Sequence, residues 1–164
     1  MKRIFFFLFL MNMIRTIDNG IMPAIATTLK DDDGMSDVEV GSLGSFVYVG
    51  EVLGSILAIP IYKKIPVKLI LLSTIVLQSI VLMVFVFADG NYRIMVISRF
   101  FTGIFQVFIT ILGPIWCDSY APADKKTTWI TWFIVATPVG IVLGYLKTAV
   151  ILSQESNWAY GFYA

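Results

Sequence analysis

The segment from Arg99 to Cys117 places the strongest constraint on the fold, because it combines a long apolar run with one narrow polar stripe. Positions spaced alternately four and three residues apart share one face of a helix. Here they are Arg99, Gly103, Gln106, Thr110, Gly113 and Cys117. Most other positions are Phe, Ile, Val, Leu or Trp, whereas a soluble amphipathic helix would carry a wide charged face. The segment is therefore predicted to be a transmembrane helix whose stripe borders a cavity, as expected for a helix of a membrane transporter.

The overall composition supports a membrane protein. Hydrophobic residues make up 58% of the 164 residues and charged residues 14%, and the mean hydropathy is +0.84. A water-soluble domain has about 25% charged residues. The net charge of +1 argues against nucleic-acid binding, which requires a basic patch or stripe. With one cysteine, Cys117, and no histidine, the chain has no internal disulfide, and we expect no metal site and no cofactor.

Long apolar runs predict an all-α fold, a polytopic membrane helix bundle with about five transmembrane helices. The predicted helices cover about residues 4–29, 38–62, 67–88, 94–116 and 127–146. Residues 147–164 would form a tail or the start of a sixth helix. We treat residues 1–164 as a single transmembrane domain.

The N-terminus allows two interpretations. Lys2 and Arg3 followed by an apolar run are typical of a secretory signal peptide. The run continues past Asp18 to about Leu29, however, which is long enough to span a bilayer. A first transmembrane helix is therefore favoured over a cleaved signal.

The loop that follows is acidic, but its carboxylates do not fit the alternating pattern of a calcium-binding loop. Ser36 and Glu39 form a capping box, which predicts that the second helix starts here.

The distribution of Lys and Arg predicts the orientation in the membrane. Cations gather at the N-terminus, in the turn after the second predicted helix and in the loop after the fourth. The alternate loops hold one cation each, namely Lys30, Arg93 and Lys147. Because cytoplasmic loops carry the excess of positive charge, the N-terminus is expected to be cytoplasmic.

Charged and amide side chains inside the predicted spans are the candidate functional residues, because each is costly in hydrocarbon. Asp18 and Arg99 are the first choices for a substrate or proton pathway, followed by Glu51, Gln106 and Arg15. A lone carboxylate at the depth of Glu51 is expected to be protonated unless it faces water or a cation. We expect these residues to line one cavity shared between helices.

A second interpretation assigns these charges no function. Arg99 could extend its side chain to the membrane interface, and Arg15 could pair with Asp18 three residues further along the same helix.

Small residues predict close helix packing. Gly50 and Gly54 form a small-xxx-small contact on the second predicted helix, and Gly140 and Gly144 form another on the fifth.

No arrangement of residues predicts an enzyme. The sequence has no pairing of a nucleophile with a histidine and no glycine-rich phosphate loop. An intramembrane aspartyl protease would need two aspartates, and the second carboxylate here is Glu51.

Four segments resemble the N-terminal half of a major facilitator superfamily transporter, most closely the spinster-like branch. The matching segments are Ile17–Gly20 (Asp-x-Gly) with Met22–Ala24, Arg99–Gly103 (Arg-x-x-x-Gly), Gly113–Tyr120 with Lys126–Thr127, and Ala136–Tyr145 (similar to Ile-Pro-Val-Gly-x-x-x-Gly-Tyr). The resemblance covers nearly the whole chain. It implies a proton- or gradient-driven carrier that works by alternating access, with lysolipid or sphingoid-type substrates.

The sequence departs from that family at three places. The turn after the second helix lacks the acidic residue of the superfamily motif and reads Lys63-Lys64-Ile65-Pro66-Val67-Lys68. Gln106 stands where spinster-like proteins carry an acid, and Asn19 stands where Arg is common. Proton coupling would therefore fall to Asp18 or Glu51.

The superfamily folds as two six-helix halves with the substrate site between them. About five helices form an incomplete half, so we expect either a fragment or a chain that assembles with another chain. The expected partners are membrane lipid, a small-molecule or lysolipid-like substrate, and the missing C-terminal half or another chain. The alternative function is a non-transporting membrane scaffold or assembly subunit.

Overall fold

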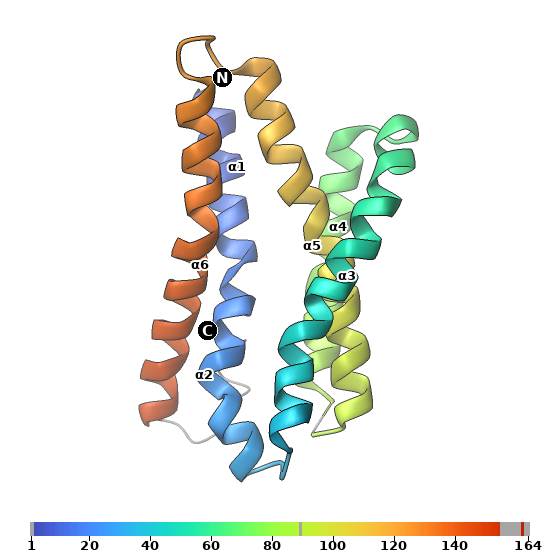
Figure 1. Cartoon of the computed structure of the whole chain (residues 1–164), viewed down its shortest axis with the longest axis vertical. Helices are drawn as coiled ribbons and strands as arrows, with labels where there is room; N and C mark the ends of the chain where they lie inside the picture. Colours follow the sequence, from blue (N-terminus) through green and yellow to red (C-terminus); the bar gives the residue numbers. More distant parts are fainter. Residues whose placement is uncertain (1, 89, 155–161, 163–164) are drawn as a thin grey trace.

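The computed structural model describes residues 2–88, 90–154 and 162, which form helices and no strands. The helices, shown in Figure 1, are α1 (Lys2–Arg15), α2 (Ile17–Asp31), α3 (Asp37–Lys64), α4 (Val67–Val86), α5 (Tyr92–Tyr120) and α6 (Lys126–Gln154). The described residues contain five stretches long and apolar enough to cross a membrane, because α1 and α2 together make one span, Lys2–Asp31. The predicted all-α bundle of about five membrane helices is confirmed.

The first span is interrupted at Thr16, where the sequence predicted one continuous helix over residues 4–29. The Thr16 hydroxyl donates to the backbone carbonyls of Asn12 at 3.1 Å and Met13 at 3.0 Å. Such bonds from a hydroxyl to its own preceding turn compete with the helical ladder and bend helices. The span therefore consists of two helices joined at the depth where the charged residues lie.

Two helices extend well beyond their predicted ends. Helix α5 continues to Tyr120 rather than 116, and α6 continues to Gln154 rather than 146. Lys147 therefore lies within α6 and not in a loop or tail, because the apolar run resumes directly after it. Of the predicted tail, residues 155–161, 163 and 164 lie outside the described residues.

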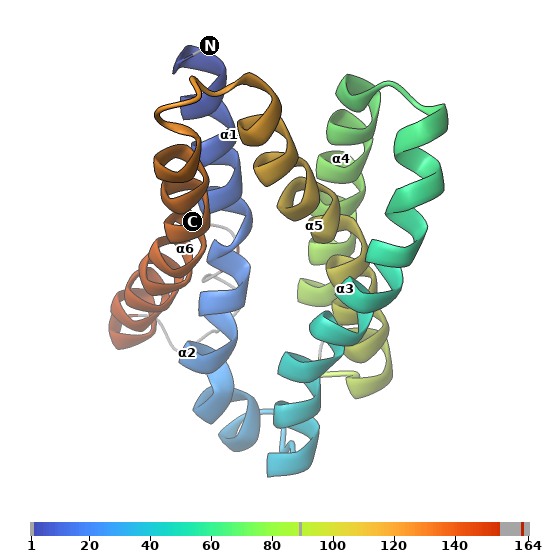
Figure 2. The same cartoon turned by 45° about the horizontal axis from the view of Figure 1, so that its top comes forward.

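The helices form two groups with α5 between them (Figures 1 and 2). One group pairs α1 and α2 with α6, and the other packs α3 and α4 along α5. Helix α5 also contacts α6 and α1, and α2 contacts α3, so the two groups form one bundle.

Glycines allow the closest helix contacts in both groups. A Cβ on Gly50 or Gly103 would overlap the backbone carbonyl of Phe100 or Val47 across the α3–α5 contact, and Gly54 lies against Ile104. In the other group, Gly140 and Gly144 of α6 lie against backbone of the first span, at Met13 and Ile17. Close backbone approach of this kind drives helix association in lipid.

The predicted capping box at the start of α3 is present. The Ser36 hydroxyl accepts from the Glu39 amide at 3.3 Å, and the Glu39 carboxylate accepts from the Ser36 amide at 2.9 Å. An ion pair between Lys30 and Asp37 also links the ends of α2 and α3.

The glycine contact predicts opposite signs for two identical substitutions in α3. Gly50→Ala should lower the free energy of unfolding by about 1–3 kcal/mol, because the new methyl group meets backbone. Gly44→Ala should raise it by up to about 1 kcal/mol, since a Cβ there meets nothing within 4 Å and Ala favours helix. Unfolding in detergent micelles, followed by circular dichroism, measures both. Equal effects of the two changes would contradict the packing described here.

Candidate functional site

The centre of the candidate site is an ion pair between Asp18 of α2 and Arg99 of α5. An Arg99 guanidinium nitrogen lies 3.6 Å from a carboxylate oxygen of Asp18, and the two side chains are 0% and 5% exposed, respectively. This separation is longer than a hydrogen bond. Within the part of the chain that the structure describes, no nitrogen or oxygen of either side chain has a hydrogen-bond partner. The two charges therefore compensate each other only in part.

Aromatic rings cover the guanidinium of Arg99. Its central carbon lies 4.2 Å from the centroid of the Phe85 ring and 5.7 Å from that of Phe162. A desolvated cation over an aromatic face gains roughly 2 kcal/mol. Arg99 is thus held inside the bundle and does not extend to the membrane interface.

Arg15 takes a different partner from the one that sequence spacing suggested. It donates to the Asn12 side-chain oxygen at 2.9 Å, and no ion pair between Arg15 and Asp18 occurs among the described residues. The break at Thr16 lies between them, so they do not have the three-residue spacing of one continuous helix. Nε and Nη1 of Arg15 have no hydrogen-bond partner in the described part of the chain.

Asn12 connects this region to α6. Its amide nitrogen donates to the Phe133 carbonyl at 3.0 Å and to the Thr137 hydroxyl at 3.1 Å. Arg15 is therefore positioned from α6 through Asn12.

Glu51 and Gln106 form a second polar contact, between α3 and α5. The Gln106 amide nitrogen donates to the Glu51 carboxylate at 3.0 Å. Gln106 is fully buried, and its side-chain oxygen has no hydrogen-bond partner among the described residues. Glu51 is only partly buried.

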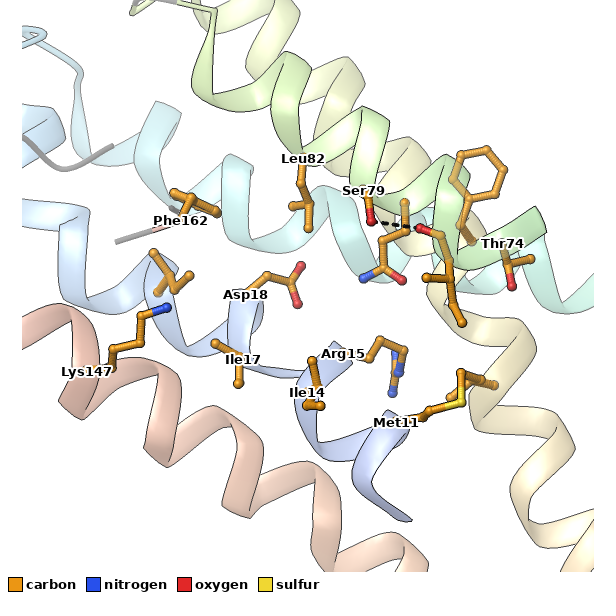
Figure 3. A pocket seen from close by; sticks show the side chains of 15 residues that line it. Met11, Ile14, Arg15, Ile17, Asp18, Thr74, Ser79, Leu82, Lys147 and Phe162 are labelled. Atoms are coloured by element: carbon orange, nitrogen blue, oxygen red, sulfur yellow. Dashed lines mark hydrogen bonds between the residues drawn. The ribbon is translucent and has the colours of Figure 1, made fainter. Parts of the chain in front are cut away.

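A cavity of about 480 Å³ lies between the first span, α4, α5 and α6 (Figure 3). Its walls are mostly aliphatic and aromatic, and polar side chains enter it from three of these elements. These polar residues are Arg15, Asp18, Thr74, Gln78, Ser79 and Lys147. In Figure 3 the Asp18 carboxylate points into the space between α4 and the first span.

The structure divides the five predicted pathway residues between two places. Arg15 and Asp18 line the cavity, with Arg99 held against Asp18. Glu51 and Gln106 are not among its lining residues. On the predicted stripe of α5, Thr110 is exposed, whereas the other five positions are buried.

Sequence analysis missed the residues that α4 and α6 contribute. Thr74 and Gln78 lie one turn apart on α4 and are both buried. Their four-residue spacing in an otherwise aliphatic helix is the signal that could have identified this face. Lys147 could have been found only by extending α6 beyond its predicted end.

A double-mutant cycle tests the central pair. Asp18→Asn and Arg99→Met should each lower the free energy of unfolding by about 3–5 kcal/mol, because each leaves a buried charge unpaired. The double variant should lose clearly less than the sum, as expected for residues in contact. Chemical unfolding in detergent micelles gives the three values, and additive losses would contradict the pairing.

Cysteine labelling tests whether the cavity contains water. Cys117, the single cysteine of the chain, is buried, so the background should be low. A water-soluble methanethiosulfonate reagent should modify Gln78→Cys in a bilayer much faster than Leu77→Cys, because Gln78 lines the cavity and Leu77 is 41% exposed on the surface of α4 outside it. Equal rates at the two positions would indicate that the cavity is filled by lipid.

Comparison with known proteins places this chain in a family. The family model described as "Major Facilitator Superfamily" matches residues 4–164. The probable sphingolipid transporter spinster homolog 3 of Arabidopsis thaliana is 28% identical over 143 residues, covering 85% of this chain and 26% of that protein. Protein spinster homolog 1 of Xenopus tropicalis is 23% identical over 157 residues, covering 92% and 29%. A putative polyol transporter 2 of Arabidopsis thaliana is 25% identical over 159 residues, covering 91% and 29%.

The chain thus spans between a quarter and a third of the length of these relatives. The resemblance found in the sequence motifs is confirmed by the match over almost all of the chain. This chain belongs to the major facilitator superfamily.

Proposed function

We propose that this chain is part of a secondary carrier that moves a small organic or lipid-like solute across a membrane by alternating access. The observation that carries the proposal is the buried Asp18–Arg99 pair beside a cavity, in a member of this superfamily. A buried pair that makes no hydrogen bond to the described residues is costly, and such groups in membrane helices mark transport pathways. A scaffold that only binds partner helices would not require buried charged residues.

The cavity favours a solute that is mainly apolar and carries polar groups. Aliphatic and aromatic side chains form most of its wall, and its charged groups, Lys147, Asp18 and Arg15, lie at separate places along it (Figure 3). Two relatives named as spinster proteins and one named as a polyol transporter are similar to this chain. Of these names, that of the sphingolipid transporter agrees better with such a wall.

Asp18 and Glu51 are the proposed proton carriers, with Asp18 the stronger candidate. Asp18 lies in the cavity wall and contacts Arg99, so a change in its charge would directly alter the interaction between α2 and α5. Glu51 is held by Gln106 at the α3–α5 contact, outside the cavity lining. None of these residues is assigned a catalytic role.

In this proposal the bundle rocks against a second helix bundle, supplied by a C-terminal half or by another chain. The basic end of the bundle, which holds Lys2, Arg3 and the α3–α4 turn, would face the cytoplasm, as the positive-inside rule expects.

Uptake in proteoliposomes tests the proposal, with this chain combined with the second helix bundle that the carrier requires. The assay applies a proton gradient and a panel of radiolabelled lysolipids, sphingoid bases and polyols. Asp18→Asn should reduce uptake of the transported solute by more than about tenfold, which corresponds to a free-energy difference of about 1.4 kcal/mol. Asp118→Asn makes the same chemical change at an exposed position on α5 and should leave uptake unchanged. Uptake that is insensitive to Asp18→Asn would remove this residue from the mechanism. If no solute in the panel responds to the gradient, a carrier of these solute classes is contradicted.

A further inference from the structure

The α3–α4 turn carries a cluster of cations that the transport site does not use. Lys63 and Lys64 close α3, and Lys68 lies in the first turn of α4. All three side chains are exposed, and none has an acidic partner among the described residues. By contrast, Lys126 at the same end of the bundle pairs with Asp118 at 3.2 Å.

The exposed residues between these lysines and directly after them are apolar. Ile65 is 39% exposed, Val67 40% and Leu69 57%. A surface that alternates unpaired cations with exposed aliphatic side chains suits the boundary between lipid headgroups and acyl chains.

Aromatic residues at the same end mark the headgroup level. Trp116 stacks on Trp129 at 6.2 Å and on Tyr120 at 5.4 Å. Figure 1 shows that the α3–α4 turn, the α5–α6 loop and the N-terminus lie at one end of the bundle. Since Trp and Tyr gather at the membrane–water interface, the three lysines also lie near the headgroups.

We propose that the basic turn, Lys63–Lys68, binds the headgroup of an anionic phospholipid. The lysines contact the phosphate and any further acidic group, while Ile65, Val67 and Leu69 contact the upper part of the acyl chains. Juxtamembrane basic clusters attract anionic lipid in this way, with a contribution from each cation. The proposal is independent of the transport site, because the turn shares no residue with the cavity.

Electron paramagnetic resonance of the chain in phosphatidylcholine bilayers tests this proposal. The association of spin-labelled phosphatidylglycerol is measured relative to spin-labelled phosphatidylcholine. The preference for phosphatidylglycerol should fall by about fivefold for each lysine replaced, when Lys63→Gln, Lys64→Gln and Lys68→Gln are combined stepwise at low salt. It should also weaken at high salt in the unmodified chain.

A control variant distinguishes a local site from the general charge of this end. The control combines Lys2→Gln, Arg3→Gln and Lys125→Gln, which remove the same amount of charge elsewhere at this end of the bundle. This variant should retain most of the preference for phosphatidylglycerol. Equal losses in the two triple variants, or no loss in the first, would overturn the proposal. Displacement of the lipid by glycerol 3-phosphate at equal phosphate concentration would also overturn it, because the site would then bind soluble phosphate. All variants change exposed side chains, and unchanged circular dichroism confirms that they fold.

Discussion

The arrangement of this bundle depends on the cost of placing the charges of Asp18 and Arg99 inside membrane-spanning helices. Each charge alone would be strongly unfavourable in the membrane interior, and together they compensate each other without complete hydrogen bonding. The pair brings α2 and α5 together at the depth where the first span is interrupted at Thr16. Phe85 covers the guanidinium on one side, and the cavity lies against the carboxylate. In the proposed carrier, this incompletely compensated pair is the contact that a proton or a solute would alter.

Close backbone contacts hold the helices on both sides of the Asp18–Arg99 pair. Glycine contacts hold α3 against α5 and α6 against the first span, with backbone touching backbone. Asn12 and Thr16 add hydrogen bonds between the first span and α6. Movement of one group of helices against the other would therefore act mainly on the contacts between the groups, where Asp18 of α2 meets Arg99 of α5.

Sequence patterns predicted much of the fold, because hydropathy and loop charges depend on local composition. The five spans, the capping box at Ser36 and the family follow from residues that are close in the chain. The partners of the polar residues depend on how helices rotate against one another, which local spacing does not determine. The polar stripe of α5 that contains Gln106 was recognised, but the contact of Gln106 with Glu51 was not. Pairing of Arg15 with Asp18 was one of two interpretations, because the break at Thr16 has no strong local signal. Lys147 was placed in a loop since a lysine in an apolar run commonly ends a span, although here the helix continues.

The central claim is that Asp18 remains in the bundle interior because it borders water. Infrared spectroscopy of the protein in lipid bilayers tests this most directly, with the Asp18 band identified by its loss in Asp18→Asn. After transfer from H₂O to D₂O, we expect the frequency of this band to shift within seconds, because the cavity admits water to the carboxyl group. A band that keeps its frequency for hours would show that Asp18 is sealed from water and would contradict the claim.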